Sequence, residues 1–102
     1  MKTINEALRL IRVFHDLNIK TFANGIGISP GFISDIENGN KNPSMELINK
    51  YAEYFNLNVS SILFFSEDLD KIKNRSDFKI NIRNKMLKFL KLIEDSAIEK
   101  ED

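Results

Sequence analysis

The apolar residues of this chain recur at helical spacing along most of its length. A first helix is predicted to start near Ile4 and to end near Leu17, with its inward face formed by Ile4, Ala7, Leu8, Ile11 and Phe14. The alternation of apolar and polar residues that is typical of strands is absent. The pattern therefore predicts an all-α fold.

Capping residues and glycines predict the bounds of the next two helices. Asn18 is a suitable N-cap for a second, short helix, which Gly27 ends. Ser29 followed by Pro30 is a common opening of a helix, and this third helix is expected to stop at Asn38-Gly39.

Two further helices complete a predicted N-terminal domain, residues 1–65. Ser44 is expected to cap the fourth helix, and Ser60 or Ser61 to open the fifth. Residues 66–76 are polar and fit either a linker or a continuation of the fifth helix, because helical spacing persists at Ile62, Phe65, Leu69 and Ile72.

The C-terminal region, residues 66–102, is predicted to contain a final amphipathic helix from about residue 77 to residue 97. Its apolar arc is wider than a coiled-coil seam and has to be buried against something. We favour pairing with a second copy of the chain, and the alternatives are packing onto the N-terminal domain or binding another protein. The expected interface residues are Phe78, Ile82, Met86, Phe89, Leu90, Ile93 and Ala97.

Composition argues against several kinds of site and location. The chain has no Cys and a single His, His15, so we expect no metal site and no cofactor. No arrangement of carboxylates and an activating base suggests an enzyme. The N-terminus does not resemble a signal peptide, and the longest apolar run, residues 62–65, is too short to span a membrane. We therefore expect a cytoplasmic protein with no membrane contact.

Charge is balanced in sum but unevenly distributed. Lys and Arg number 15, as do Asp and Glu, so the net charge is zero. Residues 71–91 nevertheless carry only Asp77 against Lys71, Lys73, Arg75, Lys79, Arg83, Lys85, Lys88 and Lys91. This basic run is either a solvated helix face or a surface that follows DNA or RNA phosphates.

Residues 19 to 38 meet the steric requirements of two short helices joined by a tight turn. Ala23 is small enough for the helix backbones to approach, and Gly27 tolerates a positive φ in the turn. The positions that such a unit must bury are all apolar, namely Phe22, Ile26, Ile28, Ile33 and Ile36. This combination is more specific than a loose short motif.

The sequence resembles the Cro/CI-type (XRE-like) helix-turn-helix regulators of phages and bacteria. The resemblance rests on these residues and on the stretch FANGIGISPGFISDIENG at 22–39, followed by NPS at 42–44. The resemblance covers about residues 4–65. It implies a five-helix domain and a sequence-specific transcriptional regulator that binds double-stranded operator DNA as a homodimer, often repressing its own promoter. The alternative is an antitoxin or inhibitor-like protein whose C-terminal helix binds a protein partner.

In such a module the second helix of the motif enters the major groove, and residues near its start face the bases. The resemblance assigns base contacts to Ser29, Pro30, Gly31, Ser34, Asp35 and Asn38. Contacts to the phosphate backbone fall to Asn18, Lys20, Thr21, Phe32, Asn40, Lys41, Asn42 and Ser44.

The sequence departs from the family at positions that matter for recognition. Ile19 stands where many relatives have a glutamine that binds a phosphate, and Pro30 and Gly31 replace long polar readers. Residues 29–38 contain no Arg or Gln, the strongest readers of guanine and adenine. Loop contacts or DNA shape are therefore expected to supply part of the specificity.

Four residues keep two interpretations each. Gly25 is either tolerated within a short helix or allows close approach to DNA, and Phe32 either packs or touches DNA. Glu37 is expected to belong to the scaffold through a local pair, and the alternative is a contact with DNA. Asp35 would repel phosphates unless it accepts a hydrogen bond from a cytosine amine.

Overall fold

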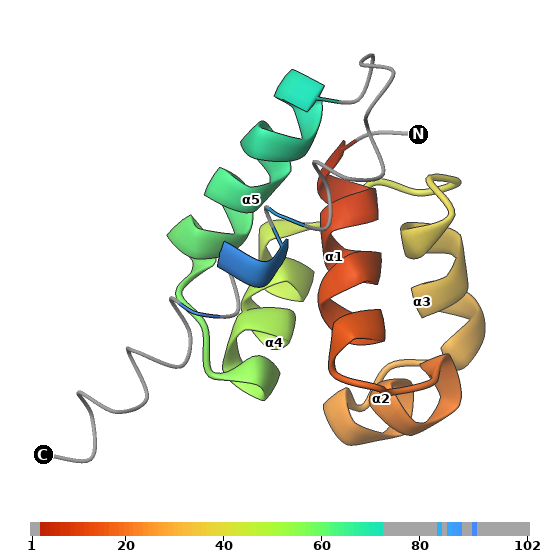
Figure 1. Ribbon diagram of the computed structural model, residues 1–102. Helices are drawn as coiled ribbons and strands as arrows, with labels where there is room; N and C mark the ends of the chain where they lie inside the picture. The colour runs from red at the N-terminus through yellow and green to blue at the C-terminus, as the bar shows by residue number, and fades with distance from the viewer. Residues whose placement is uncertain (1–2, 73–83, 85, 89–90, 92–102) are drawn as a thin grey trace, which may run out of the picture.

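The computed structural model describes residues 3–72 together with residues 84, 86–88 and 91. Five helices follow one another in this part of the chain: α1 (Thr3–Phe14), α2 (Ile19–Ile26), α3 (Pro30–Glu37), α4 (Met45–Phe55) and α5 (Val59–Ile72) (Figure 1). The described residues include no strand. The predicted all-α fold is confirmed.

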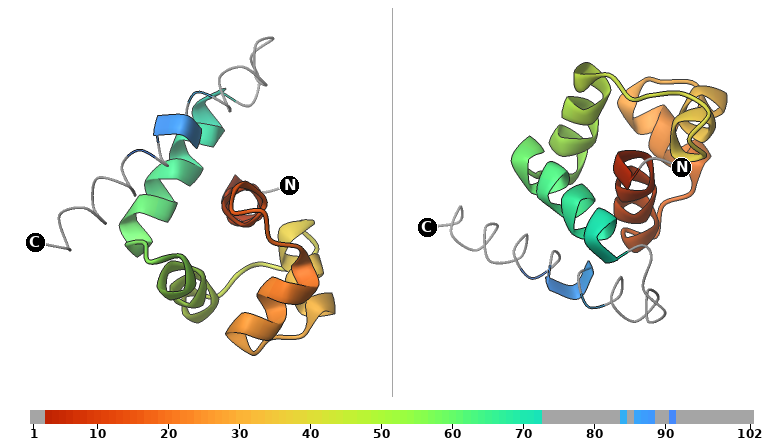
Figure 2. Two further views of the ribbon diagram at one scale, coloured as in Figure 1. Left: turned by 60° about the horizontal axis from the view of Figure 1, so that its bottom comes forward. Right: turned by 90° about the horizontal axis from the view of Figure 1, so that it is seen from above.

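Helix α1 lies at the centre of the domain. It packs against α5 on one side and α3 on the other, while α2 packs against α3 and α4, and α4 packs against α5 (Figures 1 and 2). The core includes Leu8, Ile11, Phe22, Ile33, Ile36, Tyr51 and Ile62 from the predicted apolar faces. Phe14, which is predicted on the inward face of the first helix, is 38% exposed, and Ile26 and Ile28 are only partly buried.

The predicted capping residues begin three of the helices. The Oδ1 atom of Asn18 accepts a hydrogen bond from the Thr21 N–H at 2.8 Å. Ser29 Oγ accepts from the Phe32 N–H at 3.2 Å, and Ser44 Oγ accepts from the Leu47 N–H at 3.1 Å. Each bond satisfies a backbone donor that has no partner within its own helix.

Helix α1 ends earlier than its apolar pattern predicts. Its last residue is Phe14, three before Leu17, because Asp16 adopts a left-handed conformation with φ of 56°. The Leu17 carbonyl then accepts a hydrogen bond from Arg12 Nη1 at 2.6 Å, which fixes the chain as it turns toward α2.

Helix α5 is longer than the predicted fifth helix. It begins at Val59, so Ser60 and Ser61 lie within its first turn instead of before it. It continues without a break past residue 65 to Ile72, and Leu69 on its inner face is 1% exposed. For residues 66–76, the alternative of a continued helix therefore holds as far as Ile72.

Of the residues expected at a dimer or partner interface, only Met86 is described. It lies in a helical turn at residues 86–88 beside α5, and its side chain is fully buried in the core of its own chain (Figures 1 and 2). Met86 is therefore an intramolecular core residue and does not stand on an open interface. Outside the described residues lie Phe78, Ile82, Phe89, Leu90, Ile93 and Ala97.

None of the helices in the described residues combines the length and apolarity needed to cross a membrane.

Candidate nucleic-acid interface

The turn between α2 and α3 has the geometry that its sequence requires. Gly27 is left-handed, with φ of 72° and ψ of 31°, and its N–H donates to the carbonyl of Ala23. The Ile28 N–H donates to the same carbonyl at 3.0 Å. Ala23 is fully buried where the helices meet. A methyl side chain at residue 23 and a glycine at residue 27 together set the sharp change of direction before α3.

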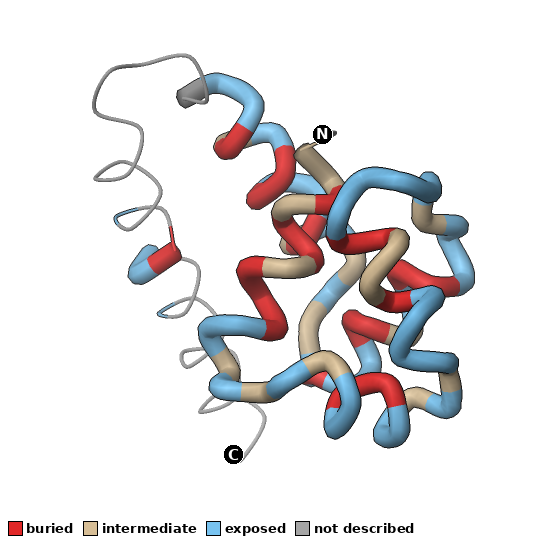
Figure 3. The backbone as a smooth tube through the Cα atoms, turned by 90° about the vertical axis from the view of Figure 1, so that its right-hand side faces the viewer, coloured by how far each residue is buried: buried red, intermediate tan, exposed pale blue. Residues whose placement is uncertain are grey.

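Helix α3 lies at the edge of the domain and presents one side to solvent (Figures 1 and 3). Ile33 and Ile36 are fully buried against the core. Pro30, Gly31 and Phe32 are exposed on the opposite side, at the start of the helix. This part of α3 is available to a ligand without any rearrangement of the fold.

The polar side chains predicted to contact bases are engaged with neighbours on the same surface. Asn38 Nδ2 donates to Ser34 Oγ at 3.2 Å. Asp35 Oδ2 lies 3.5 Å from Lys41 Nζ, which joins a predicted base contact to a predicted phosphate contact. Ser29 uses its Oγ to cap the helix.

The predicted phosphate contacts fall into two groups. The first group is Asn18, Lys20 and Thr21, which are exposed at the start of α2. This start of α2 lies at one end of α3 (Figure 1). The exposed residues 40–42 follow the other end of α3, and exposed Ser44 comes two residues later (Figure 1). The two groups therefore flank α3, which is the arrangement needed to position a helix between two phosphate strands.

Phe32 belongs with the second group. The residue is 38% exposed, and Lys41 Nζ lies 5.1 Å from the centroid of its ring. This is within the range of a cation–π contact. The ring is therefore a partly exposed packing surface for Lys41 and does not enter the core.

A buried ionic network holds α3 against the rest of the domain. Glu37, fully inside the protein, accepts hydrogen bonds from Arg12 Nε at 2.9 Å and from the Tyr51 hydroxyl at 2.7 Å. Arg12 Nη2 lies 2.8 Å from the same carboxylate, which completes a bidentate pair. Burial and the adjacent carboxylate raise the pKa of Tyr51 above its ordinary value.

This network corrects the expectation that Glu37 pairs locally. Its partners come from α1 and α4, 25 and 14 residues away in the sequence. Glu37 is nevertheless a scaffold residue, as expected, because it joins three helices and lies away from the exposed side of α3.

Asn5 is a positioning residue that the sequence analysis missed. Its Nδ2 atom donates to the carbonyls of Ile36 at 2.5 Å and Lys41 at 2.9 Å, and the residue is 1% exposed. Asn5 and Arg12 are seven residues apart, so they lie on one face of α1 together with buried Leu8. The sequence signal for this role was the presence of two polar residues, seven positions apart, on the apolar face of a helix.

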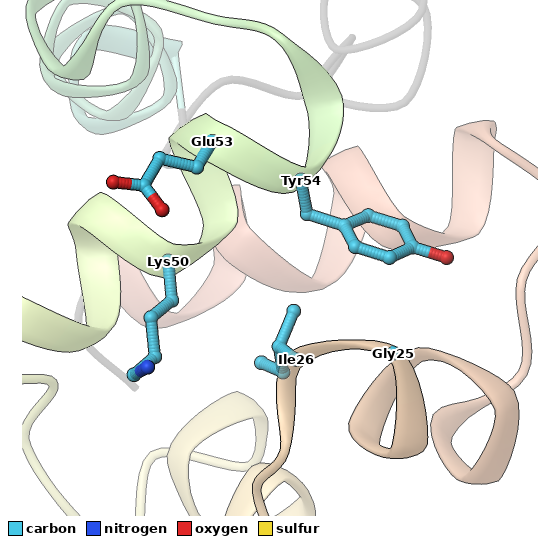
Figure 4. A pocket seen from close by; sticks show the side chains of 5 residues that line it. All are labelled: Gly25, Ile26, Lys50, Glu53 and Tyr54. Atoms are coloured by element: carbon cyan, nitrogen blue, oxygen red, sulfur yellow. The ribbon is translucent and has the colours of Figure 1, made fainter.

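Gly25 has a packing reason that neither of its two interpretations included. A Cβ atom at this position would lie 2.7 Å from Cε2 of Tyr54. Figure 4 shows Tyr54 of α4 over the backbone of α2, beside a shallow pocket that Ile26, Lys50 and Glu53 also line. Glycine at residue 25 therefore allows α4 to approach α2 closely.

His15 packs as an aromatic residue. Its ring lies 4.4 Å from that of Phe55, centroid to centroid, and its Nδ1 atom is 2.6 Å from the Ile11 carbonyl oxygen. Within the part of the chain that the structure describes, no three His, Cys, Asp or Glu residues are grouped in a way that could hold a metal ion.

Comparisons with known proteins agree with this geometry. A family model described as a helix-turn-helix domain matches residues 5–64. The cryptic phage CTXphi transcriptional repressor RstR of Vibrio cholerae is 28% identical over 85% of this chain and 68% of its own length. An uncharacterized HTH-type transcriptional regulator of Methanocaldococcus jannaschii is 31% identical over 60% of this chain and 92% of its own length. An uncharacterized HTH-type transcriptional regulator of Bacillus subtilis is 36% identical over 58% of this chain and 75% of its own length. No solved structure gives a significant match.

Proposed function

This chain belongs to the helix-turn-helix family of DNA-binding transcriptional regulators, and from that premise we propose that it is a repressor that binds its operator as a homodimer. The family is a class of regulators and not of enzymes. Binding to chromosomal or phage DNA would place the protein in the cytoplasm.

The observation that carries this proposal is the exposed side of α3, held in a fixed direction by buried Glu37. Because Glu37 is bonded to α1 and α4, α3 cannot turn independently of the domain. Exposed groups at the start of α2 and at residues 40–42 stand at either end of α3. In this arrangement α3 would enter the major groove while the flanking groups contact phosphates.

The homodimer follows from the small number of side chains available for base contacts. Within residues 29–38 these are short; Asn38 is hydrogen-bonded to Ser34, and Asp35 pairs with Lys41 of the following loop. Two copies on adjacent half-sites would double the contacts, with a separation of about 34 Å along the duplex. Repression is proposed because the Vibrio cholerae relative is named as a repressor. A protein partner for the C-terminal region remains the alternative to self-association.

The direct test compares a duplex from the region upstream of the protein's own gene with a random duplex of equal length at the same salt concentration. We expect tighter binding to the first, a footprint over two half-sites, and two chains per duplex by sedimentation. Ser34→Ala should weaken specific binding, whereas Ser60→Ala, at an exposed position of α5, is the matched control. Equal affinity for both duplexes would refute operator recognition.

A further inference from the structure

We propose that Asp35 and Lys41 contact DNA as one ion pair, in which Asp35 selects a cytosine and Lys41 cancels the charge of Asp35. This inference rests on the proposed entry of α3 into the major groove. It assigns Lys41 a role in specificity, in place of the independent phosphate contact that the sequence predicts.

The side chains of the pair meet on the surface that faces the proposed DNA. Lys41 Nζ and Asp35 Oδ2 are 3.5 Å apart, and the two side chains are 53% and 41% exposed. The same ammonium group also lies 5.1 Å from the centroid of the Phe32 ring. Lys41 therefore has two partners on α3, and both are predicted DNA contacts.

The backbone fixes this arrangement independently of the ion pair. The Asp35 carbonyl accepts hydrogen bonds from the N–H groups of Asn40 at 2.9 Å and Lys41 at 3.3 Å. From the other side, buried Asn5 donates to the Lys41 carbonyl at 2.9 Å. The loop after α3 is thus attached both to α3 and to α1, and Lys41 starts from a position within reach of Asp35.

An exposed ion pair is weak in water, but its surroundings change when DNA covers it. A lone carboxylate at residue 35 would be repelled by the phosphates on both sides of the groove. The ammonium group of Lys41 cancels this repulsion, and the exclusion of water strengthens the attraction between the pair.

The chemistry of the bases then determines what Asp35 can select. A carboxylate can only accept hydrogen bonds, and the cytosine N4 amine is its usual donor in the major groove. Guanine and thymine present acceptors at this edge and would be rejected, and adenine is disfavoured because its N6 amine lies beside the N7 acceptor, which repels a carboxylate. Asp35 is therefore one residue through which a chain without Arg or Gln in residues 29–38 can distinguish a base pair directly.

The test combines Asp35→Asn, Lys41→Met and the double variant in the full-length chain. Each variant is used to select sites from a random DNA pool, and the affinity for the wild-type site is measured over a range of salt concentrations. Glu67→Gln removes the same charge as Asp35→Asn from an exposed position of α5, which α1 separates from α3 (Figure 1). Thermal melting of each variant checks that the fold is intact.

We expect Asp35→Asn to abolish a cytosine preference at one position of each half-site. It should also steepen the dependence of log affinity on log salt by about one unit, because the released Lys41 can then neutralise a phosphate. Lys41→Met should weaken binding about tenfold more in the wild-type background than in the Asp35→Asn background. The Glu67→Gln control should change neither the base preference nor the salt dependence.

The inference would be overturned if the two substitutions changed the affinity independently and Asp35→Asn left the base preference unchanged. The proposed function would still stand. A wild-type chain that enriches no sequence from the pool would remove the proposed function and the inference together.

Discussion

Replacement of Glu37 by Gln tests the contribution of the buried network to the position of α3. The substitution keeps the shape of the side chain but removes its charge. Arg12, whose side chain is 10% exposed, would then be a cation without its counterion, and the Tyr51 hydroxyl would lose a charged acceptor. Loss of one partner of a buried pair costs about 3–5 kcal/mol. Glu37→Gln should therefore lower the free energy of unfolding by that amount.

The same substitution at Glu6 is the matched control. Glu6 forms an ion pair with Arg9 at 2.6 Å, but on the surface, with the two side chains 23% and 37% exposed. Surface pairs of this kind contribute about 0–1 kcal/mol. Urea denaturation measures the free energy of unfolding of both variants, and so compares the cost of losing the buried pair with the cost of losing the surface pair. Equal m-values would show that the two variants expose the same surface on unfolding.

A similar cost for Glu37→Gln and Glu6→Gln would refute the claim that the buried network is a major constraint on the fold. If Glu37→Gln does not fold at all, Tyr51→Phe provides the milder change, because it removes one hydrogen bond to the carboxylate. Its expected cost is about 1.5–3 kcal/mol in the same assay.

Three further predictions concern the same scaffold. Because burial raises the pKa of Tyr51, the contribution of Tyr51 to stability is complete below its unfolded pKa of about 10 and is lost as the pH rises above that value. The free energy of unfolding of Tyr51→Phe should therefore fall less steeply above pH ~10 than that of the wild type, as measured by urea denaturation at a series of pH values. Gly25→Ala should destabilise the wild type by about 1 kcal/mol because the added methyl group meets the Tyr54 ring, but it should stabilise a Tyr54→Ala variant by about the same amount. Equal effects in both backgrounds would contradict this packing. Gly27→Ala should cost about 1 kcal/mol because φ is 72°, whereas Gly31→Ala, where nothing lies within 4 Å of an added Cβ, should be neutral or stabilising by thermal melting.

The sequence predicts the helices of this domain well because their signals are local. Asn18, Ser29 and Ser44 each accept a hydrogen bond from a backbone N–H three residues later, so a short window contains both partners. The early end of α1 was missed because it depends on the left-handed conformation of Asp16, a residue that only occasionally adopts it.

The contacts that position the candidate site were not predictable in the same way. Asn5 bonds to carbonyls 31 and 36 residues away, and Arg12 pairs with Glu37 across 25 residues. The apolar pattern indicates which helix faces are buried but not how the helices are placed against one another. The Asp35–Lys41 pair depends on the path of the loop after α3, which Asn5 helps to fix.

The burial of Met86 has a consequence for the interpretation of truncated forms of this protein. The side chain belongs to the hydrophobic core, and the helical turn at residues 86–88 that carries it lies beside α5 (Figure 1). A protein cut after Ile72 would leave that volume empty and α5 uncovered there, at a cost comparable to deletion of a large core side chain, about 2–5 kcal/mol. Such a form would bind DNA poorly because fewer molecules are folded, even though every residue that faces the groove is still present.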